Sequence, residues 1–286
     1  MYEFIRDKDR QTVYFVPDDL PLEEAISRTT HMGISAHQDD IEIMAAHGII
    51  ECFRRDDKWF FAVVVTDGAG SPREGLYKFY TDEEMKKVRE KEQKKAAYAG
   101  EYGALALMNY SSMAVKNPND EEIVQKLASL ISEAGPDIIY THNPADKHDT
   151  HVAVAIKVIK AVRMLQKEER PKKIYGCEVW RSLDWVNDDE KVLLDVSVHP
   201  NISAALLALH DSQISGGKRY DMAVVGRRTA NATFANYKAT DTAAALTYAM
   251  DLTPLIEDDK LDIREYTAGF IDRFKRDVLN RINNLL

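Results

Sequence analysis

Apolar runs alternate with amphipathic segments along most of this chain. Five runs have the length and composition of strands, at residues 32–35, 60–66, 104–108, 137–140 and 174–180. The segments between them repeat their apolar residues with a helical period, at residues 41–53, 82–102, 120–134 and 152–165. This alternation is typical of right-handed βαβ units. It predicts an α/β, Rossmann-like fold with a mainly parallel sheet and helices on both faces.

The segments outside this alternation are less regular. Residues 12–16 predict a short strand, and residues 22–26 predict a short helix. A hairpin is expected over residues 185–196, with its turn at residues 187–189, and a helix is expected over residues 202–213.

The C-terminal segment carries an apolar stripe at helical spacing, made of Ile263, Tyr266, Phe270, Phe274, Val278, Ile282 and Leu285. Such a helix either packs on its own domain or contacts another subunit, so a homo-oligomer is one option. We expect three parts: an N-terminal elaboration (1–30), an α/β core (31–215) and a mostly helical C-terminal extension packed on the core (216–286).

Composition argues against two classes of partner. The net charge of −9 leaves no basic stripe for a nucleic acid, and the lysine-rich segment 86–95 is interrupted by glutamates, as on a solvated helix face. No apolar run has the length of a signal peptide core or a membrane span, and the two cysteines form no disulfide framework. We therefore expect a cytoplasmic protein that binds neither nucleic acid nor membrane.

Polar residues gather where the first predicted core strand ends. Residues 36–42 read Ala-His-Gln-Asp-Asp-Ile-Glu, which places one imidazole and three carboxylates at a strand-to-helix junction. Buried unpaired carboxylates are costly, so such a cluster caps a helix, faces water or holds a cation. On its own, this cluster leaves helix capping open.

A second cluster lies at the end of another predicted strand. Residues 141–151 read Thr-His-Asn-Pro-Ala-Asp-Lys-His-Asp-Thr-His. Ligands of parallel sheets bind beyond the carboxyl ends of the strands, so both clusters belong to one edge and suggest one divalent metal site. A zinc site with an open position needs three nitrogen or oxygen donors, and His37, Asp40 and His151 would serve.

The neighbours of these ligands suggest catalytic roles. Asp39 is placed to act as a general base for water, and His148 can stabilise an oxyanion if Asp146 or Asp149 keeps it protonated. His142 ends a strand at the same edge and is expected to contact substrate. Dinucleotide-binding, P-loop and serine-hydrolase motifs are absent from the sequence.

Together these residues resemble the LmbE-like, PIG-L superfamily of zinc-dependent N-acetylglucosaminyl deacetylases. Residues 36–42 match its Ala-His-Pro-Asp-Asp-x-Glu motif, and Asp146, His148 and His151 match its Asp-x-His-Pro-Asp-His motif. Weaker echoes occur at residues 65–68, at Arg89 and Glu92, at residues 178–180 and at residues 210–213.

The resemblance implies a role for each matched residue. His37, Asp40 and His151 would bind one Zn²⁺ per chain, with another divalent metal as an option. Asp39 would be the general base, His148 and Asp146 would complete the catalytic set, and Arg89 would lie near substrate. Two departures stand out. Gln38 replaces a proline, and Thr150 replaces an aspartate associated with the partner histidine, which puts catalytic strength in question more than metal binding.

The function expected from this resemblance is zinc-dependent removal of an N-acetyl group from an N-acetylglucosamine-type sugar or conjugate. Two alternatives remain open. One is a metal-dependent hydrolase of another amide or ester on a non-sugar molecule. The other is a metal-stabilised binding protein that has lost turnover, although a protein that only binds has no need for a base at Asp39.

Overall fold

Eight strands form a single sheet in the computed structural model, which describes residues 12–286. Their order across the sheet is β1-β4-β3-β2-β5-β6-β8-β7, with β4, β3, β2, β5 and β6 mutually parallel and with β1 and β8 antiparallel to their neighbours. The strands are β1 (Val13–Phe15), β2 (His31–Ser35), β3 (Phe60–Thr66), β4 (Ala104–Tyr110), β5 (Ile138–His142), β6 (Lys173–Cys177), β7 (Lys191–Asp195) and β8 (Leu246–Asp251).

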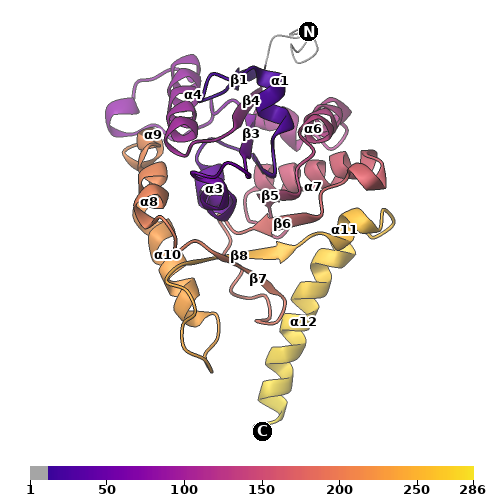
Figure 1. Cartoon of the computed structure of the whole chain (residues 1–286). Coiled ribbons are helices and arrows are strands. Elements are labelled where there is room, and N and C mark those ends of the chain that lie inside the picture. Colours follow the sequence, from indigo (N-terminus) through magenta and orange to yellow (C-terminus); the bar gives the residue numbers. More distant parts are fainter. Residues whose placement is uncertain (1–11) are drawn as a thin grey trace.

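Helices cover both faces of the sheet (Figure 1). One apolar layer includes α1 (Leu22–Ser27), α6 (Glu121–Ala134) and α7 (Asp149–Met164). The opposite layer includes α2 (Asp40–Met44), α3 (Ala46–Cys52), α4 (Asp82–Ala99), α8 (Pro200–Ala208) and α10 (Tyr220–Phe234). The other helical segments are η1 (Gly75–Tyr77), α5 (Ser112–Lys116), η2 (Lys167–Glu169), α9 (Asp211–Ile214), α11 (Pro254–Glu257) and α12 (Ile263–Asn283).

Strand β3 shows why the core has two layers. All seven of its residues are buried, and alternate side chains enter opposite apolar clusters: Phe61, Val63 and Val65 on one face, Phe60, Ala62 and Val64 on the other. A continuous apolar run is what a parallel strand needs when helices cover both of its faces. The predicted fold class is therefore confirmed, and each of the five predicted core strands is present within a few residues.

The predicted helix at residues 41–53 is instead two helices, α2 and α3, which meet at Ala45. The carbonyls of Glu42 and Ile43 both accept hydrogen bonds from the Arg228 guanidinium, at 2.7 and 3.1 Å. Arg228 lies on α10, far along the chain, and its buried guanidinium takes carbonyls that a continuous helix would pair internally. The break thus depends on a tertiary contact that a local pattern does not contain.

The predicted hairpin at residues 185–196 is wrong. Only its second arm is a strand, β7, and this strand pairs with β8 rather than with the residues before it. The first arm holds a turn in which the N–H of Val186 donates to the carbonyl of Leu183 at 3.0 Å, and both side chains enter the core. Their apolar character therefore reflects burial. Strand β8 and helix α10 were not predicted.

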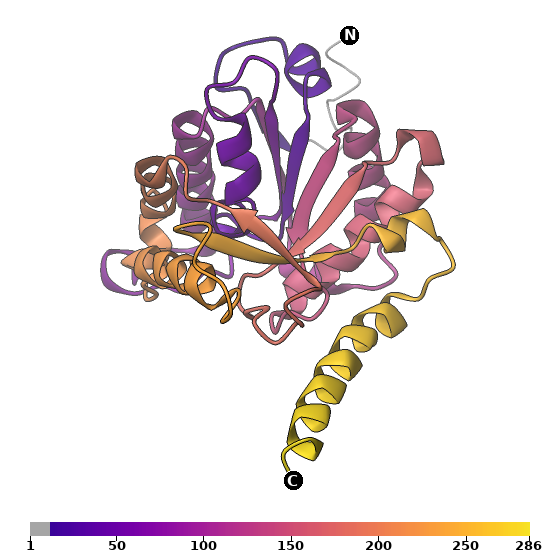
Figure 2. The same ribbon diagram turned by 60° about the horizontal axis from the view of Figure 1, so that its bottom comes forward.

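Two further segments differ from expectation. The helix predicted at residues 202–213 is divided into α8 and α9. The C-terminal stripe does form a helix, α12, but packing on the core ends near Phe270, beyond which Phe274, Val278 and Ile282 are exposed. Figure 2 shows α12 extending away from the sheet.

Residues 216–286 also supply β8 to the common sheet, and the division at residues 30/31 and 215/216 stays a prediction. Within residues 12–286, no helix combines the length and apolar character needed to span a membrane.

Candidate metal centre and its pocket

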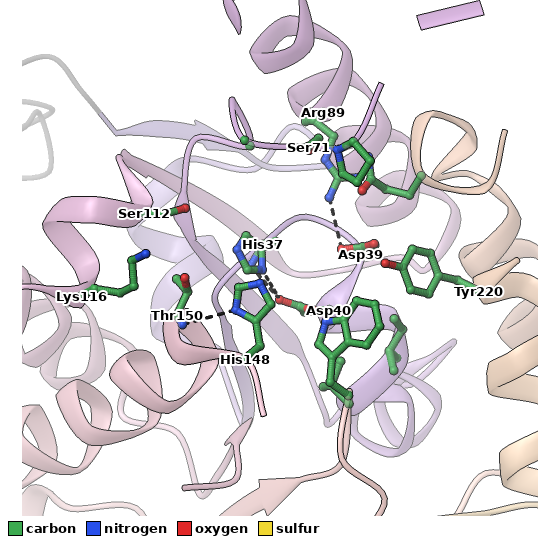
Figure 3. A pocket seen from close by; sticks show the side chains of 17 residues that line it. His37, Asp39, Asp40, Ser71, Arg89, Ser112, Lys116, His148, Thr150 and Tyr220 are labelled. Atoms are coloured by element: carbon green, nitrogen blue, oxygen red, sulfur yellow. Dashed lines mark hydrogen bonds and ion pairs between the residues drawn. The ribbon is translucent and has the colours of Figure 1, made fainter. Parts of the chain in front are cut away.

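The two polar clusters meet at the centre of the sheet edge. From β2 the chain runs outward through β3 to β4, then returns to place β5 on the other side of β2. The carboxyl ends of β2 and β5 therefore flank the point where the strand order reverses, which is where α/β sheets form ligand crevices. A pocket of about 370 Å³ opens there, lined mainly by His37, Asp39, Asp40, Gly68, Arg89, Ser112, Lys116, His148, Thr150, Trp180, Gln213 and Tyr220 (Figure 3).

Three side-chain atoms converge at one wall of this pocket. His37 Nδ1 lies 3.1 Å from Asp40 Oδ2 and 3.2 Å from His151 Nε2, and the last two atoms are 3.3 Å apart. Donors about 2.0–2.1 Å from a tetrahedral zinc ion would be separated by roughly 3.3–3.4 Å. The nearly equal sides of this triangle match that spacing, so these three residues could bind a metal ion. They are the residues that the sequence proposed as ligands.

Local backbone contacts build the first cluster. The N–H of His37 donates to Asp40 Oδ2 at 2.8 Å, which folds the turn so that both side chains face the same point. Asp39 is the N-cap residue of α2, yet its side chain makes no capping hydrogen bond. Helix capping therefore does not explain this pair of aspartates.

The carboxylates around His151 favour a positive charge in the cluster. Burial opposes ionisation of Asp40, but the imidazoles of His151 and His142 outweigh it and hold the pKa of Asp40 well below its usual range. Burial alone would lower the pKa of His151, whereas Asp40 and Asp146 raise it to about 9. The carboxylates of Asp40 and Asp146 thus favour a positive charge on the His151 imidazole that lies between them. A divalent metal ion could take the place of that proton.

The Asp146 side chain contacts the candidate ligand His151 rather than the ring of His148. Its Oδ2 atom lies 3.4 Å from His151 Nδ1 and accepts a 3.2 Å hydrogen bond from the backbone N–H of Trp180. A carboxylate on the far nitrogen of a ligating histidine orients the ring and raises its basicity. The expectation that Asp146 keeps His148 protonated is therefore wrong.

His148 is instead held as a neutral ring. Its Nδ1 accepts a hydrogen bond from the N–H of Thr150 at 3.3 Å, and Asp149, the other expected partner, is exposed. Burial, followed by the neighbouring imidazoles of His151 and His37, lowers the pKa of His148. Because Nδ1 is an acceptor, Nε2 carries the proton of the neutral ring.

Asp39 faces the pocket from an unusual backbone conformation, with φ 93° and ψ −32°. A non-glycine residue in this region stores strain of about 1–3 kcal/mol, which its surroundings must hold in place. The N–H of Asp39 donates to Gln93 Oε1 at 3.3 Å, and Arg89 Nη2 donates to Asp39 Oδ1 at 3.1 Å. Burial raises the pKa of Asp39, and the Arg89 guanidinium opposes that rise.

Arg89 is almost fully buried, although it borders the pocket. Besides Asp39, its guanidinium donates to the carbonyl of Gln38 and lies 3.8 Å from Glu92. Glu92 in turn accepts hydrogen bonds from the N–H and hydroxyl groups of Ser212 on α9. The guanidinium of Arg89 therefore interacts mainly with groups of the protein itself. Its contact with substrate stays a prediction.

Gly68 closes the loop after β3 over these residues. Its φ is +74°, and a Cβ atom at this position would lie 2.7 Å from Gln38 Oε1 and 2.9 Å from Arg89 Cγ. Both the backbone angle and the close approach require glycine.

His142 lies beneath the metal-binding triangle, outside the pocket lining. Its Nε2 accepts a 2.8 Å hydrogen bond from the N–H of Ala36, and its ring stacks on His151 with the centroids 3.9 Å apart. The expectation that His142 contacts substrate is therefore wrong. The residue joins β5 to β2 and supports His151.

Sequence patterns missed several residues of the site. Gln93 holds Asp39 and also donates to Glu42 Oε1 at 2.8 Å, but a glutamine within a charged helix carries no local signal. Glu42 is further bound by His210 of the loop before α9, at 2.9 Å. Tyr220 was missed because α10 was not predicted. Trp180 and Gln213 fall inside segments that the family resemblance had pointed out.

Residues 32–162 match the family model described as PIG-L, GlcNAc-PI de-N-acetylase. The matched segment contains His37, Asp40 and His151, as well as Asp39 and His148. A comparison with functionally curated proteins found no match.

Solved structures share the fold of this chain at low sequence identity. An N,N'-diacetylchitobiose deacetylase from Pyrococcus horikoshii is 16% identical with a TM-score of 0.59, covering 78% of this chain and 84% of its own. A deacetylase of the A40926 pseudoaglycone is 15% identical with a TM-score of 0.57, covering 79% and 98%.

GalB, a 4-carboxy-2-hydroxymuconate hydratase from Pseudomonas putida, is 15% identical with a TM-score of 0.61, covering 78% and 96%. Because the same fold occurs with different activities, these likenesses support the architecture, and the reaction has to be argued from the site.

Proposed function

We propose that this protein is a zinc-dependent deacetylase that hydrolyses the N-acetyl group of an N-acetylglucosamine-type sugar or sugar conjugate. The observation that carries the proposal is the triangle of His37 Nδ1, Asp40 Oδ2 and His151 Nε2, with sides of 3.1–3.3 Å, at the wall of a pocket. The family description, which names a de-N-acetylase, supports the same reaction class.

The donor set suits zinc. Two imidazole nitrogens and one carboxylate oxygen are a usual set for a catalytic zinc site that keeps one position open, and Asp146 supplies the customary carboxylate behind His151. When bound, Zn²⁺ supplies a Lewis acid for the amide carbonyl and for a water molecule.

Asp39 would take the proton from the attacking water. Its carboxylate lines the same pocket, and Asp39 lies within the turn between His37 and Asp40. Burial raises the pKa of Asp39, which makes it a better base, while the Arg89 guanidinium opposes that rise. Arg89 and Gln93 therefore act as positioning residues for the base.

His148 would donate a hydrogen bond to the oxygen of the scissile carbonyl. Thr150 occupies Nδ1, so the proton of the neutral ring lies on Nε2. A neutral donor needs no carboxylate partner, which explains how threonine can stand at residue 150. This role replaces the cationic one expected from the sequence.

A metal-dependent hydrolase of a different amide or ester is the second candidate. A hydratase has the same fold, so the architecture alone does not select the substrate or the reaction. This observation supports the second candidate. The two are separated by testing acyl release from sugar and non-sugar amides on one preparation.

The deciding experiment measures metal content and acetate release together, on wild type and on His151→Ala, with N-acetylglucosamine and its conjugates as substrates. We expect about one zinc per chain and acetate release in wild type, with both lost in the variant. Zinc binding without acetate release would reject the proposed substrate. Absence of zinc from the wild type after incubation with excess metal would reject the metal site itself.

A further inference from the structure

A second compartment of about 160 Å³ adjoins the pocket on the side of Trp180 and Tyr220. Four residues line both spaces: Ile43, Val179, Trp180 and Tyr220. Tyr220 stands at the junction, and Figure 3 shows its hydroxyl turned toward Asp39. A group bound in the second compartment would therefore lie next to a group bound at the metal centre.

The compartment has mainly apolar walls. Ile43, Val179 and Val224 are buried and form its floor, and the Trp180 ring meets the Tyr220 ring edge to face with centroids 5.9 Å apart. These walls offer little to the hydroxyl groups of a second sugar ring.

The cations around the compartment are largely occupied by other groups. Arg219 makes two hydrogen bonds to Asp221, and Arg227 donates to the carbonyl of Val179. Lys218 lies over the Trp180 ring, with its Nζ atom 5.6 Å from the ring centroid. The space is therefore shaped for an apolar group.

Trp180 is also tied to the metal centre through its backbone. Its N–H donates to the same Asp146 oxygen that faces His151. This contact fixes the position of Trp180 relative to His151. The distance between the compartment and the metal centre is therefore fixed as well.

On the basis of the proposed function, we propose that this compartment is a substrate subsite for an apolar group of about benzene size. A cavity of about 150 Å³ is sufficient to bind benzene. The group belongs to the same molecule as the scissile amide. It is either an acyl chain longer than acetyl or an apolar aglycone, and both present the same chemistry to these walls.

Three substrates test the subsite on the full, zinc-loaded chain: N-acetylglucosamine, N-hexanoylglucosamine and phenyl N-acetyl-β-glucosaminide. We expect kcat/KM for one of the two larger substrates to exceed that of N-acetylglucosamine by about tenfold or more, because its apolar group leaves water. Preference for the hexanoyl compound identifies an acyl site, and preference for the phenyl compound identifies an aglycone site.

Ala223→Phe fills the compartment from an exposed position on α10, so the fold should tolerate it. Val225→Phe is the matched control, since Val225 is 45% exposed on the same helix and lines neither space. The preference should disappear in Ala223→Phe and persist in Val225→Phe. Equal turnover of all three substrates by wild type would overturn the subsite and leave the deacetylase proposal intact.

A binding measurement separates failure of the subsite from failure of the proposed function. Phenyl β-glucoside has no amide, and its affinity is measured by calorimetry on the same three proteins. Binding that Ala223→Phe weakens and Val225→Phe preserves would support the subsite even if no amide were hydrolysed. Absence of binding to wild type, together with equal turnover, would reject it.

Discussion

The pocket has two walls that differ in construction. The strand-end wall, made of His37, Asp39, Asp40 and His148, follows β2 and β5 and is held by short-range turns and by buried hydrogen bonds to Asp39. The opposite wall, made of Val179, Trp180, Tyr220 and Ala223, comes from α10 and the loop after β6 and is largely apolar. The first arrangement suits a reaction that needs fixed distances, and the second suits selection among substrates.

Substitution of Asp39, the proposed base on the strand-end wall, should reduce turnover more than any substitution on the apolar wall. Asp39→Asn keeps the size and hydrogen-bonding shape of the side chain but removes the carboxylate. We expect kcat to fall by about 10²- to 10⁴-fold, the usual contribution of a positioned base, with zinc content unchanged. Elemental analysis and acetate release on one sample check both points. Wild-type turnover at full zinc occupancy would reject the assignment of Asp39.

Arg89→Gln tests whether the base depends on its buried cation. Loss of this charge-assisted hydrogen bond should lower kcat by about tenfold to a hundredfold. Since Arg89 lowers the pKa of Asp39, its removal raises that pKa, and the acid limb of the kcat/KM profile should move to higher pH. Lys86→Gln on the same helix is the control, because Lys86 pairs with Asp67 and Glu83 instead. If the acid limb of Arg89→Gln did not move, Arg89 would not be the group that lowers the pKa of the catalytic base.

Asp146→Asn tests the support behind His151. Loss of the carboxylate should weaken zinc affinity by about 10- to 100-fold, as is typical for partners of ligating histidines. Asp149→Asn, an exposed change three residues away, should leave zinc affinity unaltered. Competition with a chelator measures both, and equal affinity in the two variants would argue that Asp146 is only structural.

The smallest effect is expected from Tyr220→Phe on the apolar wall. The ring remains and only one hydroxyl is lost, so kcat/KM should fall by about fivefold, which corresponds to one hydrogen bond. Tyr98→Phe, at a position 69% exposed on α4, should be neutral. A loss of kcat/KM comparable with that of Asp39→Asn would mean that Tyr220 takes part in the chemistry. The apolar wall would then not be limited to substrate selection.

Sequence patterns predicted the central part of the fold well because its elements are local. β2, β3 and β5 are recognisable as apolar runs of strand length, and α6 and α7 repeat their apolar residues with a helical period. Prediction was less accurate after Cys177. There β7 pairs with β8 across more than 50 residues of chain, and no short turn in the sequence indicates which strand is the partner. The exposed end of α12 is a related case, because its stripe predicts a helix without saying what it contacts.

The sequence by itself determined which side chains could form a site: two His/Asp clusters stand at the ends of strands, and parallel neighbouring strands bring them to the same edge of the sheet. The tertiary structure decided how those side chains divide the work. It assigned Asp146 to His151, left His148 neutral, moved His142 beneath the ligands and brought Gln93, Trp180 and Tyr220 to the pocket. The physical reason is that hydrogen-bond partners and burial depend on distances of a few ångströms between elements far apart in the chain, which no periodic pattern encodes.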